Sequence, residues 1–415
     1  MQCTWLVQEV ATYFMRRGTA VNACLLDCSK EFDKCRFDKL FQKLLAKGLP
    51  AVIVRVLIFM YEEQVGWVKL GGRKSDLFTL TNGTRQGSVL SPLLFSVYLD
   101  DLLVKLRAMQ LGCHIGGWWY GAMGYADDLI LLAPNREVLQ KMVLECERYG
   151  QEHNLVFSTD PVPALSKTKC MYLCGRTTNV QYPAPVQLDG KSLPWVQHAL
   201  HLGHTLHQTV AMDKDCHRAR AAFIAKSVDV REQFAFAQPS QVIKMVQILC
   251  CDAYGSMIWD LKSDSAEQFF KCWNTCIKLA NRVPRSTFTY LVEGYFASNQ
   301  VSLRNQVLSR YSGFYRNLLS SPSREVRMLA NMVSADPRSN TCRNLKYLRK
   351  MTNNDQIEWF SSWRVRELLP VQGVPDKESW RVGLLTKLLE MRQLEYVEVK
   401  DNQKICAMVD SLCST

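Results

Sequence analysis

The first half of the chain alternates short apolar runs with amphipathic segments. The runs at residues 23–26 and 129–133 are short and continuous, which is typical of buried strands. Residues 121–126 lie just before the second run and predict a partner strand, with a tight turn between the two. Apolar residues recur at helical spacing over residues 37–45, where Leu45 belongs to the expected buried face.

Further elements complete an alternating pattern over residues 19–210. Ser91 and Pro92 open an apolar helix. We expect its buried side to consist of Leu93, Leu94, Val97 and Leu102. Hairpins at residues 66–80 and 182–195, a helix at 135–154 and a strand at 170–173 make up the rest. Beyond about residue 212 the pattern predicts helices, such as 216–236 and 241–249, so the fold class is α+β followed by a helical part.

Composition narrows the class of protein. The chain has 415 residues, of which 47% are hydrophobic, which is enough for a large core in two or three domains. Its 51 Lys and Arg exceed its 39 Asp and Glu, giving a net charge of +12. A basic balance favours a polyanionic partner, although many ordinary proteins are equally basic.

Cysteine usage and the chain start indicate an intracellular protein. The 16 cysteines are scattered, and residues 1–18 lack the basic and apolar regions of a signal peptide. We therefore expect reduced thiols and a nuclear and/or cytoplasmic location. The most apolar stretch, residues 51–61, is too short to span a bilayer and carries Arg55, so we expect no transmembrane segment.

Histidine and cysteine spacings do not indicate zinc. The pairs Cys170/Cys174 and Cys272/Cys276 are four residues apart, a spacing that on a helix is more often part of the core. Four histidines recur every third residue, a period that suits neither one strand face nor a known ligand set. They are His198, His201, His204 and His207.

Two adjacent aspartates, Asp127 and Asp128, lie in the predicted tight turn, in the string GYADDLILLAP. Two like charges at one turn repel unless a cation neutralises them. Hard divalent ions with oxygen ligands, above all Mg²⁺, are the usual partners of such a pair. Because aspartate is also common in turns, a solvated turn is the alternative interpretation.

A third carboxylate, Asp27, ends the apolar run at residues 23–26. A neighbouring strand can bring it close to the turn that holds Asp127 and Asp128. Carboxylates at such strand ends are the ligands of a two-metal phosphoryl-transfer site. There one ion activates the attacking hydroxyl, and both stabilise the charge of the in-line transition state.

A polar loop lies between these carboxylates in the sequence. Gly83 and Gly87 allow a ligand to approach the backbone closely, and Arg85 and Gln86 offer planar hydrogen-bond donors there. A glycine-flanked turn before a helix can hold a nucleotide. Ordinary surface loops have a similar composition, so the loop alone decides nothing.

Five motifs follow one another along the chain: LLDCSKEFD, NGTRQGSVLSPLLF, YADD, SKTK and HLGHTL. Their order and spacing resemble the palm motifs of reverse transcriptases of non-LTR (LINE-type) retrotransposons, over roughly residues 1–210. The resemblance implies a right-hand polymerase palm followed by a mostly α-helical thumb and C-terminal extension. We expect a residual fingers helix at residues 1–18, the palm at 19–210, and the thumb with the extension at 211–415.

The resemblance also implies the catalytic residues. Asp27, Asp127 and Asp128 match the metal ligands, which would hold two Mg²⁺ ions, with Mn²⁺ possible. Lys167 matches a proton donor to the pyrophosphate leaving group. An exposed surface lysine is the alternative for Lys167.

Other motif residues match nucleotide and primer contacts. Phe32 matches the aromatic position that blocks a ribose 2′-OH, with a core aromatic as the alternative. Beside it, Glu31 stands where the family usually has a small residue, and Asp33 matches an acidic position that we interpret as structural. The residues that match nucleotide and template contacts are Arg85, Gln86, Gly87 and Tyr125. Leu202 and Gly203 match the turn that supports the primer end.

The function implied is RNA-directed DNA polymerisation, with an RNA template, a DNA primer and dNTPs as partners; protein partners are unknown. The family has basic fingers before its first motif, whereas residues 1–18 predict only one helix that Gly18 ends, with Leu6, Val10 and Phe14 on one face. A catalytically inactive nucleic-acid-binding remnant is therefore the alternative. An RNA-templated RNA polymerase is a third interpretation, disfavoured by Phe32 and by YADD.

Basic clusters in the helical part suggest contacts with a template–primer duplex, or else solvated helix faces. The two clusters are Arg218, Arg220 and Lys226, and Arg338, Arg343, Lys346, Arg349 and Lys350.

Overall fold

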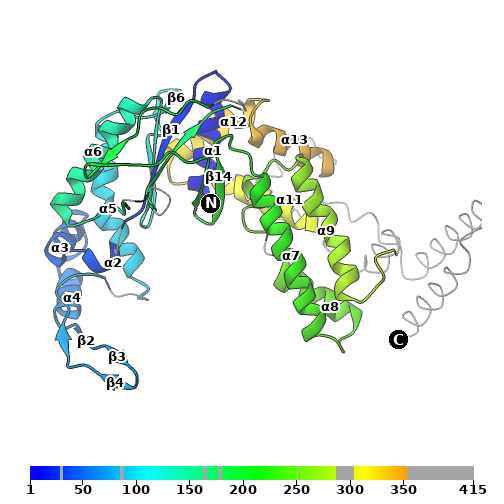
Figure 1. Ribbon diagram of the computed structural model, residues 1–415, viewed down its shortest axis with the longest axis horizontal. Helices are drawn as coiled ribbons and strands as arrows, with labels where there is room; N and C mark the ends of the chain where they lie inside the picture. Colours follow the sequence, from blue (N-terminus) through cyan, green and yellow to red (C-terminus); the bar gives the residue numbers. More distant parts are fainter. Residues whose placement is uncertain are drawn as a thin grey trace, which may run out of the picture.

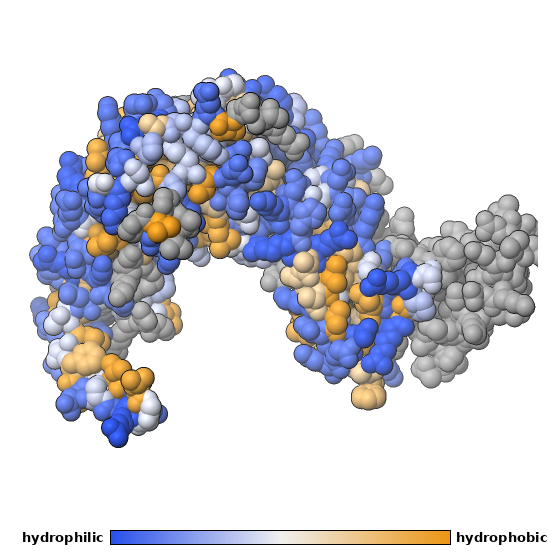
Figure 2. Space-filling model, in the orientation of Figure 1, coloured by the Kyte–Doolittle hydropathy of each residue, from blue (hydrophilic) through white to orange (hydrophobic). Residues whose placement is uncertain are grey.

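The computed structural model describes residues 1–28, 31–84, 88–160, 162, 166–175, 180–251, 253–286 and 303–352. The described part forms an arch, with a sheet at its top and two arms pointing down (Figure 1). One arm carries α3, α4 and the small strands β2 to β4, and the other carries α7, α8 and α9. Figure 2 shows an open hollow between the two arms.

The central sheet has four antiparallel strands in the order β10–β1–β9–β8. They are β10 (Lys169–Leu173), β1 (Val21–Leu26), β9 (Asp128–Ala133) and β8 (Ala122–Tyr125). All six residues of β1 are buried, which explains why the run is continuous rather than alternating. The strands predicted at residues 23–26, 121–126, 129–133 and 170–173 are confirmed.

The sheet separates two hydrophobic cores. Along β1, Ala23 and Leu25 face one core, and Cys24 and Leu26 face the other. This alternation follows from the two-residue period of a strand. On the Cys24 side, α5 (Ser91–Ala108) packs against β8, and α6 (Arg136–His153) packs against β9 and β1. The arm at that side adds α2 (Glu31–Lys34), α3 (Phe37–Ala46) and α4 (Ala51–Glu62).

The predicted helices exist, but two leucines were placed on the wrong face. Leu93 is 62% exposed and Leu45 is 48% exposed. In α5 the buried face is defined by Leu94, Tyr98 and Leu102, at spacings of four residues. Leu93 lies one position before this face, about 100° around the helix. An apolar side chain there was counted as core only because of its type.

Short hairpins connect these elements. The pairs are β2 (Val65–Gly66) with β5 (Phe78–Thr79), and β3 (Lys69–Leu70) with β4 (Arg73–Lys74). Others are β6 (His114–Ile115) with β7 (Trp118–Trp119), β11 (Gln187–Leu188) with β12 (Lys191–Ser192), and β13 (His198–His201) with β14 (His204–His207). The hairpin predicted over residues 66–80 is confirmed, and Gly71 and Gly72, which both have positive φ, form its turn.

From residue 213 to residue 352 the described chain is helical. The elements are α7 (Asp213–Gln233), α8 (Pro239–Met245), η1 (Val246–Cys250), η2 (Ser256–Ile258), α9 (Asp264–Ala280), α11 (Leu303–Leu319), α12 (Arg324–Ala335) and α13 (Asn340–Thr352). Helices α7 and α9 pack side by side, with Phe223 stacked on Trp273 at 6.1 Å. The π-helical turn η1 continues α8 where a regular helix was expected.

The first helix, α1 (Gln2–Met15), joins the sheet to the helical part. It is buried on all sides from Thr4 to Thr12, and not only on the face of Leu6 and Val10. Trp5 donates a hydrogen bond to the Thr341 hydroxyl at 3.1 Å, and that hydroxyl donates to Glu9 at 2.7 Å. Burial raises the pKa of Glu9 above its ordinary value. Thus α1 is a central helix that holds α13 against the sheet.

The cysteines in the described segments are free thiols, and all but Cys3 are buried. Every described helix is too short or too polar to cross a membrane.

We predict opposite stability effects for two glycine-to-alanine substitutions. Gly112 has a φ of +104°, and an added Cβ would lie 2.6 Å from the Cα of Gly121. Gly112→Ala should therefore lower the free energy of unfolding by about 1–3 kcal/mol. Gly313 lies inside α11 with no described atom within 4 Å of an added Cβ. Gly313→Ala should raise the free energy of unfolding by about 0.5–1 kcal/mol. Urea denaturation measures the free energy of unfolding of both variants. An equal loss of this free energy in the two variants would contradict the prediction.

Candidate functional site

The aspartate pair lies at the end of the β8–β9 hairpin. Tyr125 pairs with Asp128, so Ala126 and Asp127 form a two-residue turn. Ala126 has a φ of 55°, in the left-handed region that residues other than glycine seldom adopt. Tight hairpins need such a conformation at the turn. The turn therefore holds Asp127 and Asp128 at one end of the sheet.

The register between β1 and β9 brings Asp27 to the same end. Leu26 lies opposite Leu129, and one further step along this antiparallel register places Asp27 opposite Asp128. Adjacent strands lie about 4.8 Å apart, and residues opposite each other point to the same face. The strand pairing therefore makes Asp27 and Asp128 neighbours without any help from their side chains.

Two residues fix the Asp27 backbone. Its N–H donates to the Thr168 hydroxyl at 3.2 Å, and its carbonyl accepts from the Ser158 N–H at 2.7 Å. The sequence interpretation missed both of these contacts. Thr168 does lie inside the SKTK motif, but no spacing marks a hydroxyl as the partner of a backbone 141 residues away.

The three carboxylates lie within range of one another's charge. Burial raises the pKa of Asp27, the Lys167 cation acts in the opposite direction, and the Asp127 charge adds to the rise. Burial also raises the pKa of Asp128, and the charges of Asp127 and Asp27 add to it. Like charges are thus gathered at a partly buried point, where a cation would relieve the repulsion.

Lys167 lies beside this group. Its Nζ is 3.7 Å from Oδ2 of Asp27, and its side chain is 72% exposed. It therefore combines a position next to the carboxylates with access to solvent.

The donor atoms suit a hard divalent cation. Oδ2 of Asp27 is buried and accepts no hydrogen bond within 3.5 Å from the described residues. Such an oxygen, next to a second carboxylate, is a typical ligand of Mg²⁺. However, no three His, Cys, Asp or Glu side chains in the described residues come close enough together to hold an ion. The backbone places the carboxylates together, and their side chains do not complete a three-carboxylate site.

Several predicted contact residues cannot be placed with their side chains. Arg85, Gln86 and Gly87 lie outside the described residues, and for Phe32 in α2 only the backbone is described. Tyr125 is described: it is 60% exposed at the end of β8, next to Asp128. It is therefore accessible to a ligand at this end of the sheet.

The four periodic histidines form a hairpin. His198 pairs with His207 and His201 pairs with His204, across a turn made by Leu202 and Gly203. Their three-residue period thus comes from two strands with a two-residue turn between them. Burial lowers the pKa of His201 to about 4, and its Nδ1 lies 3.2 Å from the Thr4 hydroxyl.

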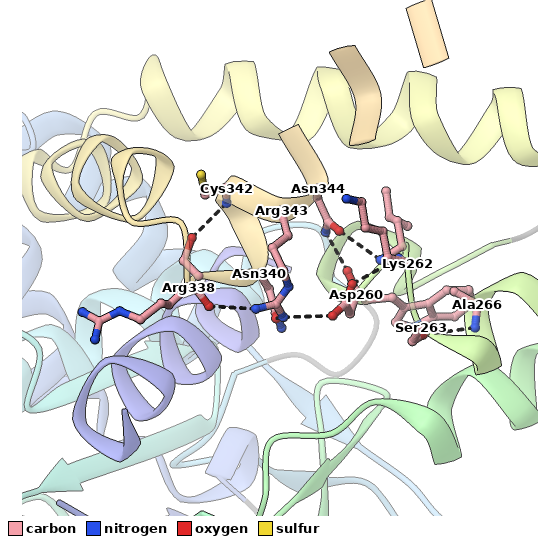
Figure 3. Close-up of polar contacts among 12 residues, drawn as sticks. Asp260, Lys262, Ser263, Ala266, Arg338, Asn340, Cys342, Arg343 and Asn344 are labelled. Carbon is pink, nitrogen blue, oxygen red and sulfur yellow. Dashed lines mark hydrogen bonds and ion pairs between the residues drawn. The ribbon is translucent and has the colours of Figure 1, made fainter. Parts of the chain in front are cut away.

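Some of the basic residues expected to face a duplex form ion pairs with aspartates of the chain itself. Arg218 pairs with Asp215, Arg338 with Asp336, and Arg343 with Asp260. Figure 3 shows the Arg343–Asp260 pair and the contacts around it. The exposed lysines of the clusters are Lys226, Lys346 and Lys350. The charge that can meet a polyanion is therefore smaller than the sequence suggested.

The first half of the chain is similar to known proteins. The reverse transcriptase (RNA-dependent DNA polymerase) family matches residues 5–205. A Pol polyprotein of the retrotransposable element R2 from Nasonia vitripennis is 33% identical over 131 residues, which are 32% of this chain and 13% of that protein. The R2DM Pol polyprotein of Drosophila melanogaster is 34% identical over 118 residues, 28% of this chain and 11% of that protein.

A solved structure, telomerase from Candida albicans with a fragment of telomeric RNA, also matches. It is 10% identical, with a TM-score of 0.38, and the match covers 89% of this chain and 52% of that one. A match at this level adds nothing to the assignment.

Residues 5–205 therefore belong to the reverse transcriptase family. Within that class, the R2 relatives confirm the resemblance to the reverse transcriptases of non-LTR retrotransposons. The matched segments cover about an eighth of those relatives' length.

We predict that Asp128→Asn stabilises the protein when Mg²⁺ is absent. The raised pKa of Asp128 means that the folded state prefers the protonated carboxyl. Ionisation therefore costs stability at pH 7, and this cost disappears as the pH falls through the raised pKa. The variant should melt a few degrees higher at pH 7, and the difference should shrink as the pH falls from the raised pKa towards the ordinary pKa of aspartate.

Added Mg²⁺ should raise the melting temperature of the unmodified chain more than that of Asp128→Asn, because an ion bound only to the folded state stabilises it. The exposed Asp76 supplies the control variant, Asp76→Asn, which should melt like the unmodified chain with and without Mg²⁺. Melting curves that are identical for Asp128→Asn and Asp76→Asn would contradict the shared-charge site.

Proposed function

We propose that this chain is the RNA-directed DNA polymerase part of a non-LTR retrotransposon protein, which adds dNTPs to a primer 3′-OH on an RNA template. The observation that carries the proposal is the β1–β9 register. It places Asp27 opposite Asp128, next to the turn with Asp127. This is the strand-end carboxylate arrangement that phosphoryl transfer requires, inside a segment that matches the reverse transcriptase family.

Asp27, Asp127 and Asp128 would hold two Mg²⁺ ions, with Mn²⁺ as a substitute, once their side chains turn towards one another, because they do not form a three-carboxylate group in the structure as it stands. When bound, the ions supply charge stabilisation for the attacking and leaving oxygens. The chain's own contribution is to keep the carboxylates in place: Thr168 and Ser158 hold the backbone of Asp27, and the hairpin turn holds the other two.

Lys167 is the proposed proton donor. The reaction removes a proton from the primer 3′-OH and leaves pyrophosphate, which becomes easier to expel when it is protonated. The Lys167 ammonium lies 3.7 Å from Asp27 and is open to solvent, so it can meet the leaving group and regain a proton from water.

The nucleotide and template contacts are proposed on the motif match. Tyr125 is exposed beside Asp128 and offers an aromatic face at the reaction end of the sheet. Phe32 follows Asp27 by five residues, in the short helix α2. Arg85, Gln86 and Gly87 complete the set as residues that line the incoming nucleotide and template.

We further propose the domain division of a right-hand polymerase. Residues 19–210 are the palm, residues 211–415 are the thumb with its extension, and residues 1–18 are a residual fingers helix. The antiparallel sheet with its helices and the separate helical arm support the first two, and a template–primer duplex would lie in the hollow between the two arms in Figure 2. The exposed lysines Lys226, Lys346 and Lys350 would meet duplex phosphates. An inactive remnant is less favoured, because all three aspartates retain their strand-end positions.

We predict Mg²⁺-dependent primer extension by the full chain on an RNA template with a DNA primer. Asp127→Asn should reduce it by at least roughly 100-fold, because electrostatic stabilisation of the transition state is usually the largest catalytic effect. Asp76→Asn is the control and should extend normally.

Binding of the template–primer is measured in parallel across salt concentrations, and the affinity should fall steeply as salt rises. Asp127→Asn should bind as the unmodified chain does. Tight, salt-dependent binding without any extension would support the inactive remnant instead.

We predict that Phe32→Val admits ribonucleotides much more readily, because a smaller side chain would leave room for the 2′-OH. Single-nucleotide extension with dNTPs and rNTPs measures the ratio of the two kcat/KM values. Phe95→Val, at a fully buried aromatic of α5, is the control for a general loss of packing. An unchanged ratio in Phe32→Val would mean that Phe32 does not exclude the 2′-OH and has a structural role instead.

A further inference from the structure

Two side chains from distant parts of the chain hold the Leu202–Gly203 turn by its carbonyl groups. The Tyr254 hydroxyl donates to the Leu202 carbonyl at 2.9 Å. Nη2 of Arg218 donates to the Gly203 carbonyl at 2.5 Å. Both residues of the turn have positive φ, 48° for Leu202 and 78° for Gly203. The turn is therefore shaped by its own backbone and held from outside at both carbonyls.

A buried carboxylate fixes Arg218 in this position. Asp215, at the start of α7, has no exposed side-chain surface and accepts from Arg218 at 2.5 Å. It also accepts from Nε1 of Trp259 at 2.9 Å and lies 3.3 Å from Nδ1 of His204. Burial alone would raise the pKa of Asp215, but hydrogen bonds from His204, Trp259 and Arg218 outweigh burial and hold it below its ordinary value. Asp215 is thus a charged, fully engaged anchor.

Tyr254 is fixed by packing. Its ring stacks on His204, with centroids 4.8 Å apart and planes 9° from parallel. The next residue, Gly255, has a φ of 93°, and an added Cβ would lie 2.6 Å from His204 and 2.7 Å from Asp215. The close approach of this segment to the hairpin therefore requires glycine.

Helix α13 holds the segment that follows Gly255, and Figure 3 shows the polar contacts of Arg343 and Asn344 with this segment. Asn344 donates to the Trp259 carbonyl at 2.7 Å and accepts from the Leu261 N–H at 2.9 Å. Arg343 pairs with Asp260 at 2.9 Å. The backbone of the segment that contains Trp259 is thus bound to α13, a helix that also contacts α1.

The held turn is linked to the sheet that carries the carboxylates. The Cys174 N–H donates to the Gln208 carbonyl at 2.9 Å, just after β10 and β14. Strand β10 pairs with β1, and Asp27 follows β1 directly. A shift of the turn relative to α7 would therefore also change the position of the turn relative to the carboxylates.

We propose that Arg218 and Tyr254 are positioning residues, which hold the Leu202–Gly203 turn so that it supports the 3′-terminal nucleotide of the primer at Asp27 and Asp128. This inference rests on the proposed function. It adds the residues that set the turn in place, with Asp215 as the anchor that orients Arg218.

Matched pairs of variants test the inference in the full chain. Tyr254→Phe removes the hydroxyl that holds Leu202. Tyr182→Phe, its control, removes a hydroxyl that bonds the Gln208 side chain at 3.2 Å. Arg218→Met removes the contact with Gly203. Arg220→Met removes the same charge from the same helix, where Arg220 bonds Gln268.

We predict that Tyr254→Phe and Arg218→Met lower kcat for primer extension by roughly 10-fold relative to their controls, since small displacements of reacting groups have large effects. Template–primer affinity should match that of each control. Arg218→Lys should recover part of the activity, because a lysine can reach one of the two acceptors. Melting temperatures check that each variant is folded.

A second readout does not depend on chemistry. A primer with 2-aminopurine at its 3′ end reports stacking of the terminal base in the bound complex. Its fluorescence should change in Tyr254→Phe and not in Tyr182→Phe. Equal signals and equal kcat within both pairs would overturn the positioning role. Absence of extension by the unmodified chain, with the fluorescence difference retained, would instead count against the proposed function alone. Absence of template–primer binding would overturn both.

Discussion

The pairing of β1 with β9 is the interaction on which the rest of the structure depends. Both strands are buried, and alternate residues of β1 enter two different cores, Ala23 and Leu25 on one side and Cys24 and Leu26 on the other. A slip of one residue would exchange the two sets and bury the wrong side chains on each face. The same register decides that Asp27 meets Asp128. Core packing therefore sets the geometry of the site.

The site itself is unfavourable for folding. Asp27 and Asp128 have raised pKa values because burial and neighbouring charges disfavour ionisation. Ala126 adopts a left-handed conformation in the turn between the paired strands. Strained backbones and gathered like charges persist only where the surroundings hold them in place. Here the two flanking cores supply that restraint.

A second polar centre joins the sheet to the helical part. Asp215 gathers donors from the β13–β14 hairpin, from α7 and from Trp259, while α1 bonds α13 through Thr341. These contacts are buried, so removing one partner leaves the other uncompensated. They make the relative position of the hairpin and α7 specific. An apolar contact of the same size would allow the two to slide.

The sequence by itself determined the local elements and the order of the motifs. Continuous apolar runs predicted β1 and β9, and helical spacing predicted α3, α5 and α6, because these patterns follow from the periods of strand and helix. The prediction that Leu93 is buried was wrong, because the type of a side chain does not say which face of the helix is covered by the rest of the protein. Tertiary structure alone decided that Asp27 lies opposite Asp128, that the periodic histidines pair across a turn, and that Asp215 anchors Arg218. Such contacts join residues far apart in the chain and leave no periodic trace, because they depend on how strands and helices pack, which no local pattern records.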